Sequence, residues 1–169
     1  MKIVVDSSPL HYLILIGKAD LLHSLFGDVL IPRSVRQELE CDGAPTAVRE
    51  WLKKPPPWAS VCAAGSVDST LPLGKGECEA ICLARELHAD VLLLDDKKAR
   101  RIAEKFGLSV AGTLAVLRVA HDRGLAQLPK SISHLRDCGF RMSDKLAREV
   151  CSEVEGQTNK TASPPHRQI

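Results

Sequence analysis

Acidic residues in this chain directly follow two apolar runs that have the composition of buried β-strands. Asp6 follows Ile3-Val4-Val5, and Asp95 and Asp96 follow Val91-Leu92-Leu93-Leu94. In open α/β sheets, ligands bind beside the carboxyl ends of the strands. An apolar core rejects a carboxylate at such a position unless the group has a partner. The two runs therefore predict one shared acidic site at that edge of a parallel sheet.

Helix geometry adds a third acid. Residues 75–88 are predicted to form a helix, and a rotation of about 100° per residue places Glu77 on the same apolar stripe as Ile81. Glu79 points nearly opposite on this helical wheel, so we expect it to be a surface acid in solvent. Glu77 is thus the acid of this segment that is predicted to face the sheet.

A further acid lies in the helix predicted for residues 32–39. Val35 and Leu39 are four residues apart and mark the inner face of this helix. Glu38 flanks that face, whereas Glu40 turns outward. A flanking glutamate can equally extend its side chain to solvent. The helical pattern alone therefore leaves open whether the Glu38 carboxylate faces the sheet or solvent.

Each strand-end acid also has a purely structural alternative. Asp6 could serve as an N-cap or turn residue before Ser7-Ser8-Pro9. One of Asp95 and Asp96 is expected to cap the helix that begins at Lys97. If the acids gather within ~4–6 Å, they raise each other's pKa unless a cation neutralises them. Because oxygen ligands favour hard ions, such a cluster predicts Mg²⁺ or Mn²⁺ rather than zinc.

Basic residues lie beside these acids in the sequence. They are Lys97, Lys98, Arg100, Arg101, Lys75, Arg33 and Arg36. Cations around a metal–carboxylate site suit a phosphodiester substrate, because the substrate is a polyanion. A solvated helix face remains the alternative for Lys97 and Lys98.

Length and composition limit the class of protein. A chain of 169 residues fits one domain, and its net charge of +2 gives no bulk field for nucleic acid. The six cysteines form no Cys-x-x-Cys pair, which disfavours a zinc site and fits reduced thiols. We find no signal segment and no apolar run of the ~18 residues that a membrane span needs. We therefore expect a cytoplasmic protein without a membrane association.

Short apolar segments alternate with longer amphipathic ones, a pattern typical of βαβ units and a parallel sheet. Strands are predicted at residues 2–6, 28–31, 60–63, 90–95 and 108–111. Helices are predicted from Pro9 onward and at residues 19–25, 32–39, 46–53, 75–88, 97–106, 113–123, 131–138 and 143–154. Residues 1–154 form the predicted domain, and the polar residues 155–169 are expected to form a flexible C-terminal tail.

Taken together, these segments resemble a known family. The pieces VVDSSPL (residues 4–10), IPRSVRQEL (31–39), LGKGECEAI (73–81), LLDDKKAR (93–100) and GLSVAGTL (107–114) match PIN-domain proteins in order and spacing. The resemblance is to the small prokaryotic group of VapC-type toxin ribonucleases, and it covers roughly residues 1–150. It implies an α/β fold, a three-layer α/β/α sandwich with a central parallel sheet.

The resemblance also implies an acidic pocket for one or two divalent metals and endonucleolytic cleavage of RNA. Asp6, Glu38 and Glu77 match the first three acids of the family, and Asp95 or Asp96 matches the fourth. The family commonly has aspartate at the third place. We therefore expect Asp6, Glu38, Glu77 and Asp95 to be catalytic, and Asp6, Glu77, Asp95 and Asp96 to be the candidate ligands of Mg²⁺ or Mn²⁺.

Lower-ranked roles and partners follow from the same resemblance. Ser7 and Thr113 are expected to support the site by hydrogen bonding, and Lys97 and Arg100 to hold the RNA backbone. A cognate antitoxin and a homodimer are the implied protein partners. Two other functions remain as alternatives: a non-catalytic PIN-like module that binds RNA or protein, and a phosphoryl-transfer domain of the receiver or dehalogenase kind.

Overall fold

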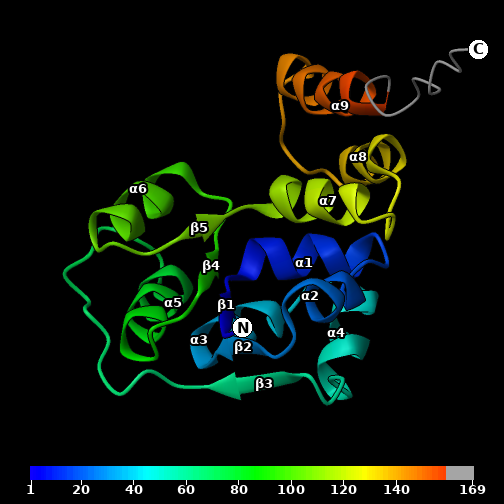
Figure 1. The fold of residues 1–169 in the computed structure, drawn as a ribbon. Helices are drawn as coiled ribbons and strands as arrows, with labels where there is room; N and C mark the ends of the chain where they lie inside the picture. Colours follow the sequence, from blue (N-terminus) through cyan, green and yellow to red (C-terminus); the bar gives the residue numbers. More distant parts are fainter. Residues whose placement is uncertain (159–169) are drawn as a thin grey trace, which may run out of the picture.

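Five short parallel strands form one sheet in the computed structural model, which describes residues 1–158 (Figure 1). Their order across the sheet is β3-β2-β1-β4-β5. The strands are β1 (Ile3–Val5), β2 (Val29–Pro32), β3 (Ala59–Cys62), β4 (Val91–Leu93) and β5 (Val110–Ala111). Each lies within a predicted segment or overlaps one. All four pairings are parallel, as the alternation of apolar and amphipathic segments predicted.

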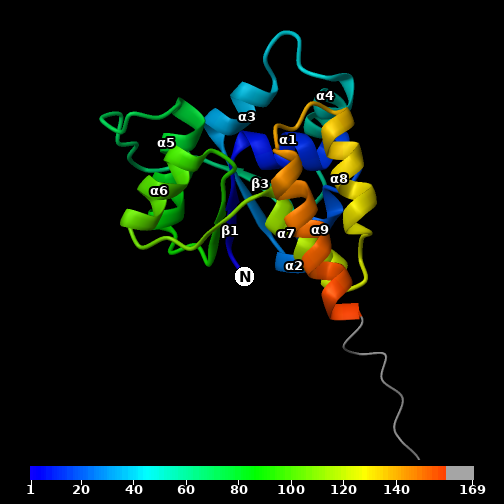
Figure 2. The ribbon, with the colours of Figure 1, turned by 90° about the horizontal axis from the view of Figure 1, so that it is seen from above.

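Helices connect the strands and continue beyond the last one. Those in the described residues are α1 (Ser7–Leu15), α2 (Asp20–Phe26), α3 (Arg33–Leu39), α4 (Thr46–Lys53), α5 (Lys75–Glu86), α6 (Lys97–Lys105), α7 (Thr113–Asp122), α8 (Leu128–Asp137) and α9 (Asp144–Thr158). In Figure 2, α8 and α9 lie side by side at one end of the molecule, and both also pack near α7.

The central strand shows how the sheet separates two apolar layers. Ile3 and Val5 join a core with α1, α2, α4, α7 and α8. Val4 points to the other face, as alternation along a strand requires, and joins a core with α5 and α6. Figure 1 shows α5 and α6 on one side of the sheet and α1, α2 and α7 on the other. The predicted three-layer α/β/α fold is thereby confirmed.

The strand register brings the two acidic strand ends together. Val5 of β1 pairs with Leu93 of β4, and the backbone N–H of Asp6 donates to the carbonyl of Leu93 over 3.0 Å. Because β1 and β4 run in the same direction, the residues after both strands emerge at the same edge of the sheet. Asp6 and Asp95 are therefore neighbours across the centre of the sheet.

Several helix boundaries differ from the predicted ones. Helix α8 begins at Leu128 rather than Ser131, with Pro129 in its first turn, where a missing N–H costs nothing. By contrast, α7 begins at Thr113 as predicted, with Gly112 at its N-cap position. Helix α9 extends to Thr158, past the expected end. The predicted tail falls mostly on residues 159–169, which lie outside the described residues.

The prediction for Glu79 is wrong. Its side chain is only 4% exposed, and it accepts hydrogen bonds from the backbone N–H groups of Ser34 (2.6 Å) and Ala64 (3.2 Å). A helical wheel assumes one buried face, but every residue of α5 from Cys78 to Ala84 is buried, because α3 and the segment after β3 cover its second side. Glu79 therefore links the start of α3 to α5. By contrast, Glu40 is exposed as predicted and pairs with Arg36.

Two further features bear on the predicted class of protein. None of the helices in residues 1–158 is long and apolar enough to cross a membrane. All six cysteines are free thiols, and they lie between residues 41 and 151.

We expect Glu79→Ala to lower the free energy of unfolding by at least about 2 kcal/mol. The substitution leaves the buried N–H groups of Ser34 and Ala64 without their acceptor. Urea denaturation followed by circular dichroism measures the change. Glu40→Ala is the matched control, because it removes an exposed i,i+4 ion pair, which contributes about 0.3–0.5 kcal/mol. Equal losses in the two variants would contradict the role assigned to Glu79.

Candidate active site

An acidic pocket lies at the carboxyl edge of the sheet. Its volume is about 400 Å³, and its walls include the side chains of all the acids that the sequence singled out for this site: Asp6, Glu38, Glu77, Asp95 and Asp96. The acids come from the end of β1, the last turn of α3, the first turn of α5 and the segment between β4 and α6. Segments distant in sequence thus meet at one cavity, as the strand-end argument predicted.

Asp6 is the most deeply buried of these acids. Its side chain is 3% exposed, and its Oδ1 atom has no hydrogen-bond partner among the described residues. The residue occupies the N-cap position of α1 but makes no side-chain capping bond, so its carboxylate is not used for capping. Burial raises the pKa of Asp6 to about 7, the Ser7 backbone N–H opposes this rise, and Glu77, Glu38 and Asp95 reinforce it by charge repulsion.

Asp95 is held in place by hydroxyl and amide donors. The backbone N–H of Thr113 donates to its Oδ1 over 2.8 Å, and the Thr113 hydroxyl donates to its Oδ2 over 2.6 Å. The hydroxyl of Ser8 also donates to Oδ2, over 3.3 Å. A Cβ atom on Gly112 would lie only 2.9 Å from Asp95 Oδ1, so the absence of a side chain at that position leaves room for the carboxylate.

Asp96 has a different environment from Asp95. It is exposed, and its Oδ1 accepts hydrogen bonds from the backbone N–H groups of Lys98 and Ala99, both over 2.8 Å. Asp96 is therefore the side chain that caps α6, one of the two alternatives left open by the sequence. The residue still borders the acidic pocket.

The first turn of α5 orients both glutamates. Glu38 Oε1 accepts a hydrogen bond from the backbone N–H of Gly76 over 2.8 Å, and Glu77 Oε2 accepts one from Gly74 over 2.9 Å. A Cβ atom on Gly76 would lie 2.5 Å from Glu38 Oε2. Glu38 is exposed as a whole residue, yet its carboxylate is tied to α5. The helical pattern allowed Glu38 to face either solvent or the site, and the residue does some of each: it is exposed, but its carboxylate contacts α5.

The chemistry of the pocket fits a hard divalent cation. All its acidic donors are carboxylate oxygens, and the partnerless Oδ1 of Asp6 with its raised pKa is the feature that a cation would relieve. The distances between the carboxylates are a separate matter. In residues 1–158, no three His, Cys, Asp or Glu side chains stand close enough to hold a metal ion together. The carboxylates line one cavity without forming a closed ligand set.

The predicted basic residues differ in position. Arg100 is half-buried, and its Nη1 would lie 3.4 Å from a Cβ on Gly112, next to Asp95. Lys97 is exposed at the start of α6, and the ammonium group of Lys98 donates to the carbonyl of Pro72. Arg36 is turned toward Glu40 and the carbonyl of Leu52, not toward the acidic pocket.

Further residues at the pocket were not anticipated from the sequence. Tyr12, Phe140 and Arg141 line it together with the acids. The Tyr12 and Phe140 rings meet edge to face with centroids 4.9 Å apart, and the Tyr12 hydroxyl donates to the Gly139 carbonyl over 3.4 Å. This contact holds the segment after α8 at the rim of the pocket, where Arg141 supplies a cation. No periodicity links α1 to residues so distant in the chain.

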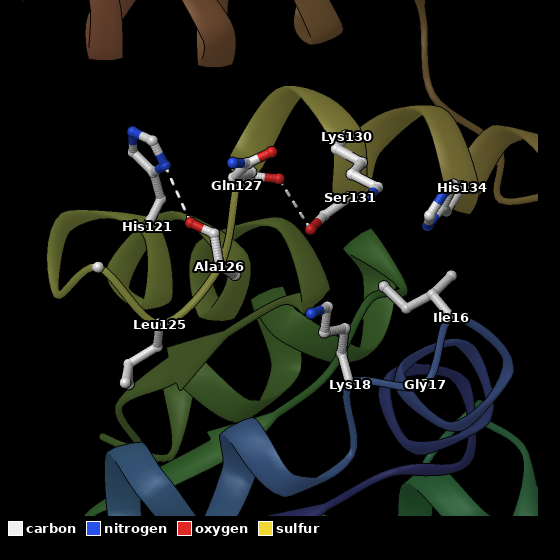
Figure 3. Close-up of a pocket in the computed structure, with 11 residues that line it drawn as sticks. Ile16, Gly17, Lys18, His121, Leu125, Ala126, Gln127, Lys130, Ser131 and His134 are labelled. Carbon is white, nitrogen blue, oxygen red and sulfur yellow. Dashed lines mark hydrogen bonds between the residues drawn. The ribbon is translucent and has the colours of Figure 1, made fainter.

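A cavity larger than the acidic pocket lies elsewhere in the described residues. It has a volume of about 600 Å³ and is formed where α1 and α7 end, with Lys18, Lys130 and His134 among its walls (Figure 3). Both helices begin beside the acidic pocket, so this cavity is at the opposite edge of the sheet. None of the predicted site residues lines it. Size alone is therefore a poor guide to the candidate active site.

We predict that Asp6→Asn stabilises the protein at pH 8 in the presence of a chelator. Because the pKa of Asp6 is about 7 when folded and 3.8 in the absence of such effects, the folded chain binds more protons than the unfolded chain between these values. The contribution of Asp6 to the free energy of unfolding is therefore fully present below pH 3.8 and is lost as the pH rises through 7. Asparagine avoids the buried charge, and the gain at pH 8 is on the order of a few kcal/mol.

Thermal melting at pH 5 and pH 8 measures this effect. The melting temperature of Asp6→Asn should exceed that of the unsubstituted protein at pH 8, and the difference should shrink at pH 5. Asp28→Asn, at an exposed position before β2, is the control and should show no such trend. Parallel pH dependences for Asp6→Asn and the unsubstituted protein would show that Asp6 is not a buried charge.

Comparisons with known proteins agree with the fold described above. A family model described as a PIN domain (DUF3368) matches residues 2–156. A solved structure of a PilT N-terminus domain protein from the hyperthermophilic archaeon Sulfolobus solfataricus P2 is 19% identical, and the alignment covers 71% of this chain and 93% of that one with a TM-score of 0.51. At that identity the likeness supports the fold alone. No curated protein matches the chain.

The family match extends over nearly all the described residues and includes every acid of the pocket. The sheet, the layers of helices and the solved structure are consistent with it. The chain therefore belongs to the PIN-domain family.

Proposed function

We propose that this protein is a divalent-metal-dependent endoribonuclease that hydrolyses RNA phosphodiester bonds. The observation that carries the proposal is the buried, partnerless carboxylate oxygen of Asp6 in a pocket with Glu38, Glu77 and Asp95. PIN domains are commonly nucleases and typically use divalent metal ions, which supports the same reaction class. The receiver or dehalogenase alternative loses support, because the family match is to PIN domains.

Asp6, Glu77 and Asp95 are the proposed ligands of Mg²⁺ or Mn²⁺, and Asp96 is a weaker candidate because its Oδ1 caps α6. When bound, the ion would lower the pKa of a coordinated water and stabilise charge that develops on the phosphate. Thr113 and Ser8 fix the orientation of the Asp95 carboxylate, and Ser7 lines the pocket beside them.

Glu38 is the proposed general base. Its Oε1 is bound to the Gly76 N–H, which leaves Oε2 to accept a proton from the attacking water. The new bond forms between that water oxygen and phosphorus, and the bond from phosphorus to the leaving nucleoside oxygen breaks. Arg141 lines the pocket, Arg100 lies next to Asp95, and Lys97 follows Asp96 at the start of α6. These cations would hold the phosphates of the RNA backbone.

The resemblance to VapC-type ribonucleases extends the proposal to a biological role. We propose that the protein is the toxin of a toxin–antitoxin pair, that a cognate antitoxin restrains it, and that it forms a homodimer. A non-catalytic PIN-like module remains the alternative, because the carboxylates are not gathered into a closed ligand set in the described residues.

We predict that Asp6→Asn and Asp95→Asn abolish Mn²⁺-dependent cleavage of single-stranded RNA while the fold is retained. The loss should exceed the roughly 10–100-fold that removal of an outer-shell partner costs, because a direct ligand is removed. Gel analysis of cleavage and circular dichroism provide the two measurements. Asp96→Asn is the matched control: asparagine still caps α6, so this variant should keep most of its activity.

An active Asp6→Asn protein would refute the assignment of the site. Purified, folded protein that binds RNA but leaves it intact with both Mn²⁺ and Mg²⁺ would favour the non-catalytic alternative.

A separate prediction concerns Gly76. Gly76→Ala places a methyl group where the Glu38 carboxylate now lies, at 2.5 Å from Oε2, so we expect this flexible side chain to swing away. Alanine favours helix by about 0.5–1 kcal/mol over glycine, but the buried N–H of residue 76 loses its acceptor, so stability should be unchanged or lower. RNA cleavage should fall at least about tenfold, because the proposed general base Glu38 no longer lies where it can accept a proton from the attacking water. Full activity in Gly76→Ala would argue against a role for Glu38.

The toxin role is tested by expression in a bacterial host. Induction of the unsubstituted protein should arrest growth, and induction of Asp6→Asn to the same level should not, because growth arrest depends on cleavage. Equal growth of the two cultures despite RNA cleavage in vitro would remove the toxin role and leave the nuclease.

A further inference from the structure

A second cavity, of about 450 Å³, shares a wall with the acidic pocket. Ser7, Ser8, Tyr12 and Glu38 line both cavities. The rest of its lining comes from His11, Leu39 and residues 41–45, which connect α3 to α4. A substrate whose phosphate sits among the acids therefore has a contiguous space into which an adjoining group can extend.

The walls of this second cavity suit a flat, apolar group. The rings of Tyr12 and His11 meet edge to face with centroids 5.0 Å apart, and the Phe140 ring contacts Tyr12 in the same way at 4.9 Å. Leu39 and Pro45 add apolar surface. Burial lowers the pKa of His11, so its imidazole is neutral at pH 7. Tyr12 is fixed by its neighbours and by its bond to Gly139, which makes it a rigid stacking platform.

We propose that this second cavity binds the base of the nucleotide next to the scissile phosphodiester. The inference rests on the proposed ribonuclease function, and it adds a specificity site to that function. Nucleobases splayed from single-stranded RNA are recognised by stacking on aromatic side chains and by hydrogen bonds to their edges. A cavity with aromatic walls that shares four lining residues with the proposed phosphodiester-cleaving pocket has the chemistry for this role.

The polar groups of the cavity also select among bases. Besides Glu38, whose two oxygens face Gly76 and the attacking water, its lining contains the carboxylate of Asp42 and no Lys or Arg. Carboxylates accept hydrogen bonds, so they match a base edge that donates from adjacent N–H groups. Guanine presents such an edge, whereas uracil presents carbonyl oxygens on both sides of one N–H. The cavity should therefore bind guanine in preference to uracil.

Cys41 allows a test of occupancy that does not depend on cleavage. Its thiol is exposed and lines the cavity. The full chain is treated with iodoacetamide in the presence of a chelator, and short RNA is added until fluorescence anisotropy shows saturation. Mass spectrometry of the digested protein then gives the alkylation rate of each cysteine. Bound RNA should slow the alkylation of Cys41 several-fold and leave Cys62 and Cys138 unchanged.

Base preference is tested with two hexanucleotides, oligouridine and the same sequence with one guanosine. The guanosine-containing RNA should protect Cys41 at a concentration at least about fivefold lower, since a good bidentate base contact contributes about 1–3 kcal/mol. Equal protection by the two RNAs would overturn the proposed selectivity.

Ala44→Phe fills the cavity, and Ala47→Phe adds the same bulk at an exposed position of α4 outside it. With Mn²⁺, Ala44→Phe should raise the KM for RNA and change the cleavage positions. The rise in melting temperature that Mn²⁺ alone produces should be the same in both variants, because neither residue borders the acidic pocket. Ala47→Phe should cleave RNA like the unsubstituted protein.

The outcomes separate the two proposals. RNA that binds at saturation without protecting Cys41 would overturn the base site while the nuclease assignment stands. Failure to hydrolyse RNA with Mn²⁺ would overturn the nuclease assignment, and the base site would fall with it. The footprint on the unsubstituted protein is decisive even if Ala44→Phe does not fold.

Discussion

The acidic pocket is built around one buried carboxylate, Asp6, at the end of the central strand β1. Asp6 follows three fully buried residues, and its position in the sheet leaves Oδ1 without a partner among the described residues. Burial and the nearby charges of Glu77, Glu38 and Asp95 raise its pKa to about 7. Such a group destabilises the folded chain at neutral pH, so its presence is explained better by the site than by the fold.

The other acids accept hydrogen bonds at the starts of helices. Glu38 accepts from Gly76 in the first turn of α5, Glu77 from Gly74 at the N-cap of its own helix, and Asp95 from the first residue of α7. Glycines at positions 76 and 112 provide the space for two of these contacts. The pocket thus depends on how α3, α5 and α7 pack against the sheet. Glu79, buried between α3 and α5, contributes to the same packing although it does not border the pocket.

Local patterns were reliable where one physical rule dominated. The apolar runs predicted the strands, because segments buried on both faces of a parallel sheet are continuously hydrophobic. The position of Glu77 in the first turn of α5 followed from helical periodicity. The burial of Glu79 did not follow from periodicity, because α5 is covered on more than one side. The Glu79 carboxylate therefore accepts a hydrogen bond from a backbone N–H instead of from water. Tyr12, Phe140 and Arg141 carry no local signal of their shared location.

The sequence by itself determined the fold class, the order of the elements and the acids that gather at the carboxyl edge of the sheet. The parallel sheet and the strand-end positions of Asp6, Asp95 and Asp96 follow from hydrophobic runs and from the direction of parallel strands, whereas the three-layer class and the inclusion of Glu38 came from the resemblance to PIN domains. Tertiary structure decided which of Asp95 and Asp96 caps α6, that Oδ1 of Asp6 lacks a partner among the described residues, and which distant residues line the pocket. Such features depend on hydrogen bonds between segments far apart in the chain, and these bonds exist only once the layers have packed.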